Sequence, residues 1–256
     1  MKHRKYSGNI LKSATSAAFL KTRLNINAKY SGNDLIGWQK SKIKFKKNSK
    51  ILDIGCGDGA QSKFIYEKLS KNGYLTSVDY SQSSISSLSE KINSVNFKCI
   101  EANMDKFNKY MDGKYDLIHS SYAIYYSSNP KKLLQECYKR LNKNGKIVIT
   151  VPCFPHTLVE ETNLINKIPL NVIQSLNFYK EILSPFIQRK FTKIKINKFK
   201  NILKISNKKD FLNIYRATTY YNKNTERSIL EKFDFSFKKL GYFKIEKNAK
   251  MVTCQK

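Results

Sequence analysis

The sequence predicts a doubly wound α/β fold, in which helices cover both faces of a largely parallel sheet. Strand-like and helix-like segments alternate between residues 50 and 152, and the segments that separate successive strands are long. A glycine-rich loop follows the first strand. Helical connections of ten or so residues between neighbouring strands are right-handed crossovers, so the strands they join are expected to be parallel.

The strands are predicted from short apolar runs bounded by polar or turn residues. These runs are KILDIG at 50–55, YLTSVD at 74–79, NFKCIEAN at 96–103, YDLIHSS at 115–121 and KIVITVP at 146–152. Short apolar runs without strict alternation are typical of strands that are buried on both faces of a sheet.

Two helices are predicted between the first three strands. The segment 60–73 has one apolar face, and Gly73 is expected to end it. The segment 81–93 begins with Ser81, a residue type that caps helix starts. The apolar face of the first helix consists of Phe64, Ile65 and Leu69.

A further helix is predicted before the fifth strand, at residues 129–145. Asn129 suits the N-cap, Pro130 suits the first helical position, and Gly145 is expected to end the helix. The inner face consists of Leu133, Leu134, Cys137 and Leu141.

Length and composition indicate one globular core with an appended cap. The chain has 256 residues, and no apolar run approaches the roughly 20 residues of a membrane span. The first 16 residues have no continuous apolar segment, so we expect a cytoplasmic protein. The five cysteines form no C-x-x-C pair, which predicts neither a metal site nor a disulfide framework.

The net charge of +29 comes almost entirely from lysine. The lysines concentrate at 40–50 and 190–209, and in the second run they alternate with Ile194, Ile196 and Phe199. This alternation predicts a half-buried strand with one solvated face. Nucleic-acid sites commonly use the planar fork of arginine, so we favour a solvated surface over an RNA footprint.

The loop ILDIGCGDG at 51–59 marks the expected ligand site. Its three glycines let the backbone turn sharply and approach a ligand closely. With Ala60 the loop also fits the dinucleotide fingerprint, and Asp79 ends the second strand, where it could accept hydrogen bonds from ribose hydroxyls. Asp53 favours another cofactor, because a carboxylate beside the glycines would repel a pyrophosphate and attract an ammonium group.

The ordered set of motifs resembles the class I S-adenosylmethionine-dependent methyltransferases, in particular those with a methyltransferase-11 or -12 like domain. The resemblance rests on ILDIGCGDG, SVDYS, EANM, YDLIHSSYAIYY and LNKNGKIVIT, and it covers residues 35–152. It implies a Rossmann-like, seven-stranded, mostly parallel sheet with a reversed last strand. It also implies S-adenosyl-L-methionine as the cofactor.

The resemblance assigns cofactor contacts to nine residues. Gly55, Cys56 and Gly57 would line the methionine part with Asp53 nearby, and Ser120 would lie beside the same part. Asp79 would bind the ribose. The adenine contacts would be Tyr80, Asn103 and Met104. Where the family often has an aspartate, this chain has Asn103, whose side-chain oxygen can still accept a hydrogen bond from the adenine amino group.

The remaining segments are expected to complete the sheet and to cover the substrate. Residues 196–205 would form the sixth strand, 226–241 a helix, and 242–256 the reversed strand. A helical lid is expected at about 155–190, and residues 1–34 would form a second cap segment beside a methyltransferase domain at 35–256. The buried face of the 226–241 helix would comprise Ile229, Leu230, Phe233, Phe237 and Leu240.

No single residue is predicted to be the base in methyl transfer, because the cofactor supplies the electrophile. The candidates are His156, His119 and Tyr122, with Tyr125 and Tyr126 as neighbours that could stack on an acceptor. His119 lies inside a strand, where a core role is the more frequent one.

Several functions stay open at this point. The favoured hypothesis is methyl transfer to an O or N atom of a small molecule, such as a sugar, a lipid-linked or a natural-product intermediate. A tRNA or rRNA methyltransferase would explain the lysine runs, and binding that weakens steeply with salt would indicate it. A nicotinamide-dependent oxidoreductase, or a fold that binds the cofactor without catalysis, are further alternatives. The oligomeric state is not predicted.

Overall fold

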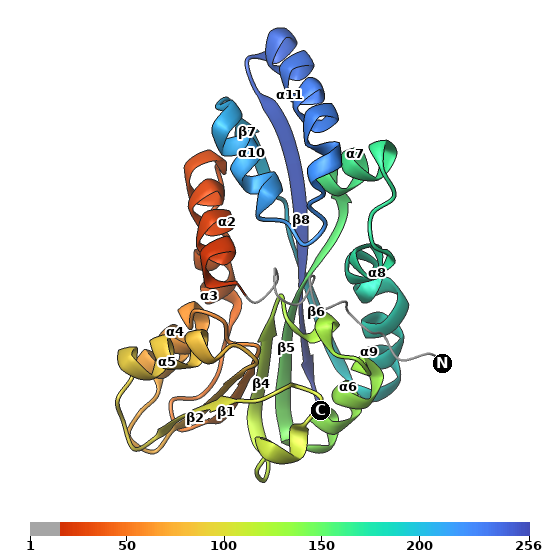
Figure 1. The fold of residues 1–256 in the computed structure, drawn as a ribbon. Coiled ribbons are helices and arrows are strands. Elements are labelled where there is room, and N and C mark those ends of the chain that lie inside the picture. Colours follow the sequence, from red (N-terminus) through yellow and green to blue (C-terminus); the bar gives the residue numbers. More distant parts are fainter. Residues whose placement is uncertain (1–15) are drawn as a thin grey trace.

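A single twisted sheet runs through the molecule in the computed structural model, which describes residues 16–256 (Figure 1). Its order is β3, β2, β1, β4, β5, β8, β6, and β7 pairs separately with β8. The first five strands are parallel, whereas β8 is antiparallel to both β5 and β6. This confirms the predicted seven-stranded, mostly parallel sheet with a reversed last strand. The strands are β1 (Lys50–Ile54), β2 (Tyr74–Asp79), β3 (Phe97–Glu101), β4 (Tyr115–Ser121), β5 (Leu141–His156), β6 (Lys193–Phe199), β7 (Ile202–Ile205) and β8 (Phe243–Gln255).

The strand order reverses between β1 and β4. The chain leaves β1 for β2 and β3 on one side and then returns to β4 on the other side. Ligands of such sheets bind beyond the carboxyl ends of the strands at this reversal. The loop 55–59 follows β1 at that position.

The helices agree with the predicted starts. Ser81 caps α5, where its hydroxyl accepts a hydrogen bond from the Ser84 N–H, and Asn129 caps α6 with Pro130 as the first residue. The helices are α2 (Ala17–Tyr30), α3 (Leu35–Lys42), α4 (Ala60–Lys68), α5 (Gln82–Lys91), α6 (Pro130–Lys139), α7 (Thr157–Ile165), α8 (Leu170–Phe178), α9 (Ser184–Lys190), α10 (Lys208–Arg216) and α11 (Glu226–Leu240), with a π-helical segment at Tyr179–Leu183.

Two predicted helix ends are wrong. Helix α4 ends at Lys68, and Gly73 lies in a turn in which its N–H donates to the Ser70 carbonyl. Helix α6 ends at Lys139, because the carbonyl of Arg140 already accepts a hydrogen bond from Tyr115 in β4. Gly145 therefore lies within β5 instead of ending a helix.

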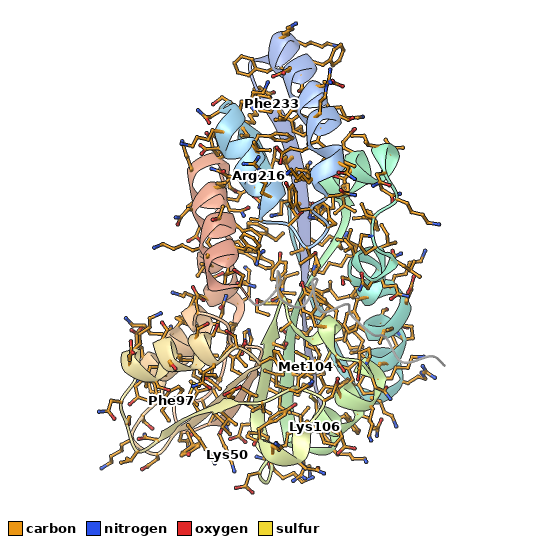
Figure 2. The ribbon with its side chains drawn as sticks, viewed as in Figure 1. Lys50, Phe97, Met104, Lys106, Arg216 and Phe233 are labelled. Atoms are coloured by element: carbon orange, nitrogen blue, oxygen red, sulfur yellow. The ribbon has the colours of Figure 1, made fainter. Side chains whose placement is uncertain are left out.

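The buried residues form two large hydrophobic cores. Helices α6 and α11, which belong to the first and the second core, lie at opposite ends of the molecule in Figure 1. The sheet core lies between the parallel sheet and α6, and the helices at residues 178–191 complete it. The cap core lies at the other end and includes Phe233, labelled in Figure 2. It combines residues of α2, α7, α8, β7, α10, α11 and β8. Strand β8 connects the two regions, because its first residues pair with β7 and its last residues pair with β5 and β6.

The carboxyl-terminal third differs from the prediction in three respects. The expected strand 196–205 is interrupted between β6 and β7 at Lys200 and Asn201, and the buried Asn201 amide donates to the Asn27 side chain of α2. Helix α10 was not predicted. Strand β6 is an edge strand, so Ile194 and Ile196 are exposed instead of half-buried.

The buried face of α11 is shorter than predicted. Ile229 and Phe233 are buried as predicted, and Leu230 packs against the cap core. Phe237 and Leu240 are 42% and 51% exposed, because the last turns of the helix extend beyond the core.

Candidate functional site

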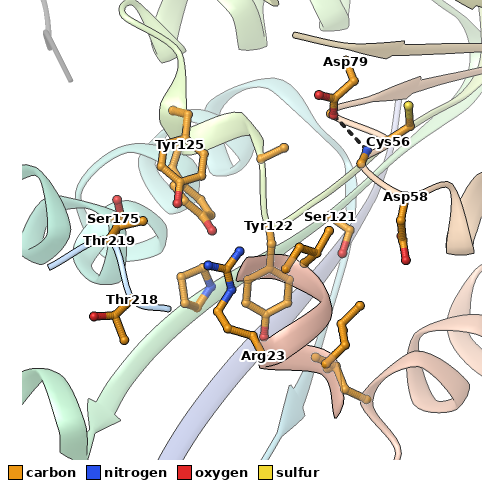
Figure 3. Close-up of a pocket in the computed structure, with 18 of the residues that line it drawn as sticks. Arg23, Cys56, Asp58, Asp79, Ser121, Tyr122, Tyr125, Ser175, Thr218 and Thr219 are labelled. Carbon is orange, nitrogen blue, oxygen red and sulfur yellow. Dashed lines mark hydrogen bonds between the residues drawn. The ribbon is translucent and has the colours of Figure 1, made fainter. Parts of the chain in front are cut away.

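A cavity of about 640 Å³ lies between the carboxyl ends of the parallel strands and the elements that form the cap core, which we call the cap. Residues of both the strand ends and the cap line this cavity. The loops after β1, β2, β3 and β4 form one side, and α2, α7, α8, residues 214–220 and Lys247 form the other. Figure 3 shows part of this lining. The volume lies in the range of small-molecule sites.

The glycine loop shapes the floor of the cavity. Gly55 and Gly57 have φ angles of +72° and +54°, which other residue types rarely adopt. A Cβ atom at Gly55 would lie 2.1 Å from the Ala123 side chain, so a larger residue would displace the loop after β4. The Gly55 and Cys56 N–H groups donate to the Val78 carbonyl and thereby fix the loop to β2.

Asp79 lies at the edge of the cavity and is held by two backbone groups. Its Oδ2 accepts from the Gly57 N–H at 2.8 Å and its Oδ1 accepts from the Ser81 N–H at 2.9 Å. Burial raises the pKa of the Asp79 carboxyl above its usual range, and the two backbone hydrogen bonds oppose that rise. A carboxylate oxygen can accept more than one hydrogen bond, so both oxygens retain capacity toward a ligand.

The three residues expected at the adenine all line the cavity. Tyr80 is 57% exposed, an unusual position for a large aromatic ring. Met104 lines the same wall. The Asn103 side-chain oxygen accepts a hydrogen bond from the Asp105 N–H at 2.8 Å, so part of its acceptor capacity is used within the loop.

Asp53, Ser120 and His119 do not line the cavity, in contrast to the other cofactor candidates. The Asp53 carboxylate is buried, accepts a hydrogen bond from the Ser62 hydroxyl at 2.5 Å and lies 2.8 Å from His119 Nδ1. The Ser120 hydroxyl donates to the Ile54 carbonyl at 2.9 Å. These three side chains support the loop from beneath it, which agrees with a core position for His119.

The other candidates for chemistry do line the cavity. Tyr122, Tyr125 and Tyr126 follow β4, and the rings of the last two lie 4.7 Å apart. Tyr122 has a φ of +53°, and burial raises the pKa of its hydroxyl. Burial and the neighbouring Lys247 lower the pKa of His156 to about 3, so its imidazole is neutral at physiological pH.

The sequence patterns predicted cap segments over the substrate but did not single out four residues that line the cavity. Arg23, Tyr220 and Lys247 lie on the cap side, and Asp58 lies at the cofactor end. One signal for Arg23 was present, since the chain has only six arginines among 48 basic residues. Tyr220 and Lys247 belong to segments without a recognisable motif, whereas Asp58 lies within ILDIGCGDG, where the glycines and Asp53 were the residues considered.

Two further searches concern the described residues alone. Within residues 16–256, no three His, Cys, Asp or Glu side chains are grouped so that they could hold a metal ion. None of the helices from α2 to α11 has the length and apolarity that crossing a membrane requires.

The fold and the site together define a Rossmann-like protein of the class I methyltransferase type. The comparisons agree. A family model described as a methyltransferase domain matches residues 45–217, and the chain belongs to this family.

Sequence relatives are methyltransferases with different acceptors. Over 172 residues the chain is 30% identical to a phosphoethanolamine N-methyltransferase of Plasmodium falciparum, covering 66% of this chain and 57% of the relative. Over 106 residues it is 29% identical to a malonyl-[acyl-carrier protein] O-methyltransferase of Ilyobacter polytropus, covering 41% and 38%. The chain thus spans about half the length of the curated relatives it matches.

Solved structures share the fold. The YcgJ protein of Bacillus subtilis superposes with a TM-score of 0.62 at 16% identity, covering 86% of this chain and 97% of that one. A mycolic acid cyclopropane synthase, crystallised with S-adenosylhomocysteine, superposes with a TM-score of 0.56 at 16% identity and 99% coverage of both chains.

Proposed function

We propose that this protein transfers a methyl group from S-adenosylmethionine to an O or N atom of a small-molecule acceptor. The observation that carries the proposal is a cavity that joins the glycine loop and Asp79 to a cap of aromatic and polar side chains. The cofactor would supply the activated methyl group, so the protein's task is to bind and align the acceptor and to exclude water.

The cofactor side of the cavity fits this role. Gly55, Cys56 and Gly57 would contact the methionine part, and Asp79 would accept hydrogen bonds from the ribose hydroxyls. Tyr80 would pack against the adenine, with Asn103 and Met104 at its edge. Because Asp53 and Ser120 lie beneath the loop, their contribution would be to hold the loop in shape.

Asp58 argues against the nicotinamide alternative. It precedes α4, and its Oδ1 accepts a hydrogen bond from the Ala60 N–H in the first turn of that helix at 3.3 Å. Dinucleotide-binding folds place a pyrophosphate at this helix start. A carboxylate at the same place would repel the pyrophosphate, so the acid that opposes nicotinamide binding is Asp58 and not Asp53.

The acceptor would occupy the cap side of the cavity. Tyr125 and Tyr126, which follow β4, offer aromatic surfaces near Arg23 of the cap. The neutral imidazole of His156 could accept a hydrogen bond from an acceptor hydroxyl or amine, although its low pKa makes it a weak base. The names of the relatives, which include phosphoethanolamine and malonyl-carrier enzymes, support a small or carrier-bound acceptor.

Calorimetric titration with S-adenosylmethionine, S-adenosylhomocysteine and NAD, each at two salt concentrations, tests the proposal. We expect the first two to bind with an affinity that changes little with salt. Binding of NAD alone, or of none of the three, would contradict it. A parallel titration with tRNA tests the nucleic-acid alternative, for which steep weakening with salt is the signature.

A further inference from the structure

The cap side of the cavity carries two cations without an acidic partner. Arg23 of α2 and Lys247 of β8 both line the cavity, and neither forms an ion pair with an acid in residues 16–256. Arg23 Nη1 donates to the Ala217 carbonyl at 2.7 Å, which uses one of its five N–H groups. The acids in the lining, Asp58, Asp79 and Asp105, all belong to the loops at the cofactor end.

The two positive charges destabilise each other. Burial lowers the pKa of the Arg23 guanidinium below its ordinary value. Burial and repulsion from Arg23 lower the pKa of Lys247 to about 8. Like charges held together in surroundings of low polarity carry a free-energy cost, which an anion between them would remove.

Two neutral polar groups near these cations also lack partners. The Tyr220 hydroxyl is buried beside Arg23 and makes no hydrogen bond to a described residue. His156 pairs with Lys247 across β5 and β8, and its Nδ1 is buried without a partner. Buried polar groups in native proteins are nearly always satisfied, so unpaired groups in a cavity wall indicate a ligand.

The cofactor is a poor candidate for this ligand. In Figure 3, Arg23 lies across the pocket from Asp79 and Cys56, and its guanidinium points toward Tyr125. Tyr126, Tyr125 and Tyr220 lie near the Arg23 guanidinium. Arg23 therefore lies on the side of the cavity away from the glycine loop.

We propose that the methyl acceptor carries an anionic group, which Arg23 and Lys247 bind with a hydrogen bond from the Tyr220 hydroxyl. The inference rests on the proposed function and names the chemistry of its substrate. Two uncompensated positive charges match a phosphate monoester, which carries about two negative charges near neutral pH, better than a carboxylate, which carries one.

Titration of the protein with inorganic phosphate, acetate and ethanolamine tests this site. Each titration is done with S-adenosylhomocysteine at saturation and again without it, at about 0.15 M salt to screen the surface lysines. We expect phosphate to bind more tightly than acetate, and ethanolamine not to bind. Acetate binding at least as tightly as phosphate would assign a carboxylate and overturn the phosphate assignment. Binding of neither anion would overturn the site.

Three variants locate the anion. Arg23→Met and Lys247→Met keep the long apolar stem and remove the charge, and each is expected to lower phosphate affinity by at least about tenfold. Tyr220→Phe should lower it by about threefold or more, as expected for a neutral hydrogen bond. Lys244→Met is the matched control, because Lys244 is an exposed residue of the same strand and should leave phosphate affinity unchanged.

Titration of every variant with S-adenosylhomocysteine separates the two proposals. A variant that keeps its affinity for S-adenosylhomocysteine but loses phosphate binding supports the anion site. If Arg23→Met instead loses S-adenosylhomocysteine, Arg23 binds the carboxylate of the cofactor and the anion site is overturned. If the wild-type protein does not bind S-adenosylhomocysteine, the proposed function fails, whereas phosphate binding without it would still decide whether the anion site exists.

Discussion

The two hydrophobic cores differ in how their residues are distributed along the chain. Most of the sheet core comes from residues 52–151, where each strand is followed by the helix or loop that covers it. The cap core gathers short pieces from residue 26, from 158–176 and from 203–245. Local patterns therefore predict the first core well, whereas the second forms only when distant segments meet.

The same contrast divides the cavity. Its cofactor side is formed by consecutive strand ends and carries the acids, while its cap side is formed by separated segments and carries Arg23 and Lys247. This difference implies that substitutions in the sheet region and substitutions in the cap act independently on stability and on cofactor binding. The following predictions test that independence, beginning with the largest expected effect.

Phe211→Ala should destabilise the cap strongly. Phe211 is fully buried, and its ring centroid lies 4.8 Å from those of Phe233 and Phe243. The cavity left behind should cost about 3–5 kcal/mol in the free energy of unfolding, measured by urea denaturation. S-adenosylhomocysteine affinity, measured by calorimetry, should change little.

The matched change in the sheet core is Leu52→Ala. Leu52 is fully buried in β1, the strand that leads into the glycine loop. The substitution should lower both the free energy of unfolding and the affinity for S-adenosylhomocysteine. Equal losses of cofactor affinity in Phe211→Ala and Leu52→Ala would show that the cap and the sheet form one cooperative unit.

Asp79→Ala should remove most of the cofactor affinity. The substitution deletes the charged acceptor for the ribose hydroxyls and leaves the Gly57 N–H without its partner. We expect at least about a hundredfold loss for S-adenosylhomocysteine in calorimetry, because charged hydrogen bonds contribute about 1.5–3 kcal/mol each.

Asp210→Ala is the control on the cap side. Asp210 accepts hydrogen bonds from Lys29 and Tyr30 and does not line the cavity. Its removal should leave cofactor affinity unchanged. Unchanged affinity in Asp79→Ala would mean that the cofactor site is misplaced.

His156 should make stability depend on pH at the junction of the two regions. Its pKa is about 3 in the folded chain, against an ordinary value of 6.5. Between these values the unfolded chain binds a proton that the folded chain does not, so the free energy of unfolding decreases as the pH falls from 6.5 toward 3.

The comparison of wild type with His156→Gln isolates this effect. All other titrating groups are common to both proteins, so their difference in urea stability should depend on pH in this window. The wild type should lose stability more steeply on acidification. Parallel pH profiles would contradict a lowered pKa of His156 in the folded chain.

Leu240→Ala should have the smallest effect. Leu240 is half exposed at the end of α11, and we expect a change within about 0.5 kcal/mol in the free energy of unfolding. Ile229→Ala on the inner face of the same helix should cost about 2–5 kcal/mol. If Leu240→Ala and Ile229→Ala lower the free energy of unfolding by similar amounts in denaturation experiments, the cap core extends farther along α11 than described.

The candidate site shows where sequence patterns were sufficient. The glycines follow β1, and Asp79 and Tyr80 lie at the end of β2; because these consecutive strands are parallel neighbours in the sheet, the meeting of these residues was predictable. The role of Asp53 was not, because the pattern fixes the position of the residue but not the side of the strand where its carboxylate finds Ser62 and His119.

The sequence by itself determined the parallel sheet, its helix starts and the glycine loop at its switch point, since these depend on local periodicity, caps and turn chemistry. Only the tertiary structure decided the division of β6 from β7, the burial of α10, and the placement of Arg23 and Lys247 in the wall of one cavity. Those two residues are more than 200 positions apart, and no local pattern records that α2 and β8 face one cavity. The proposed anion site depends on that long-range arrangement.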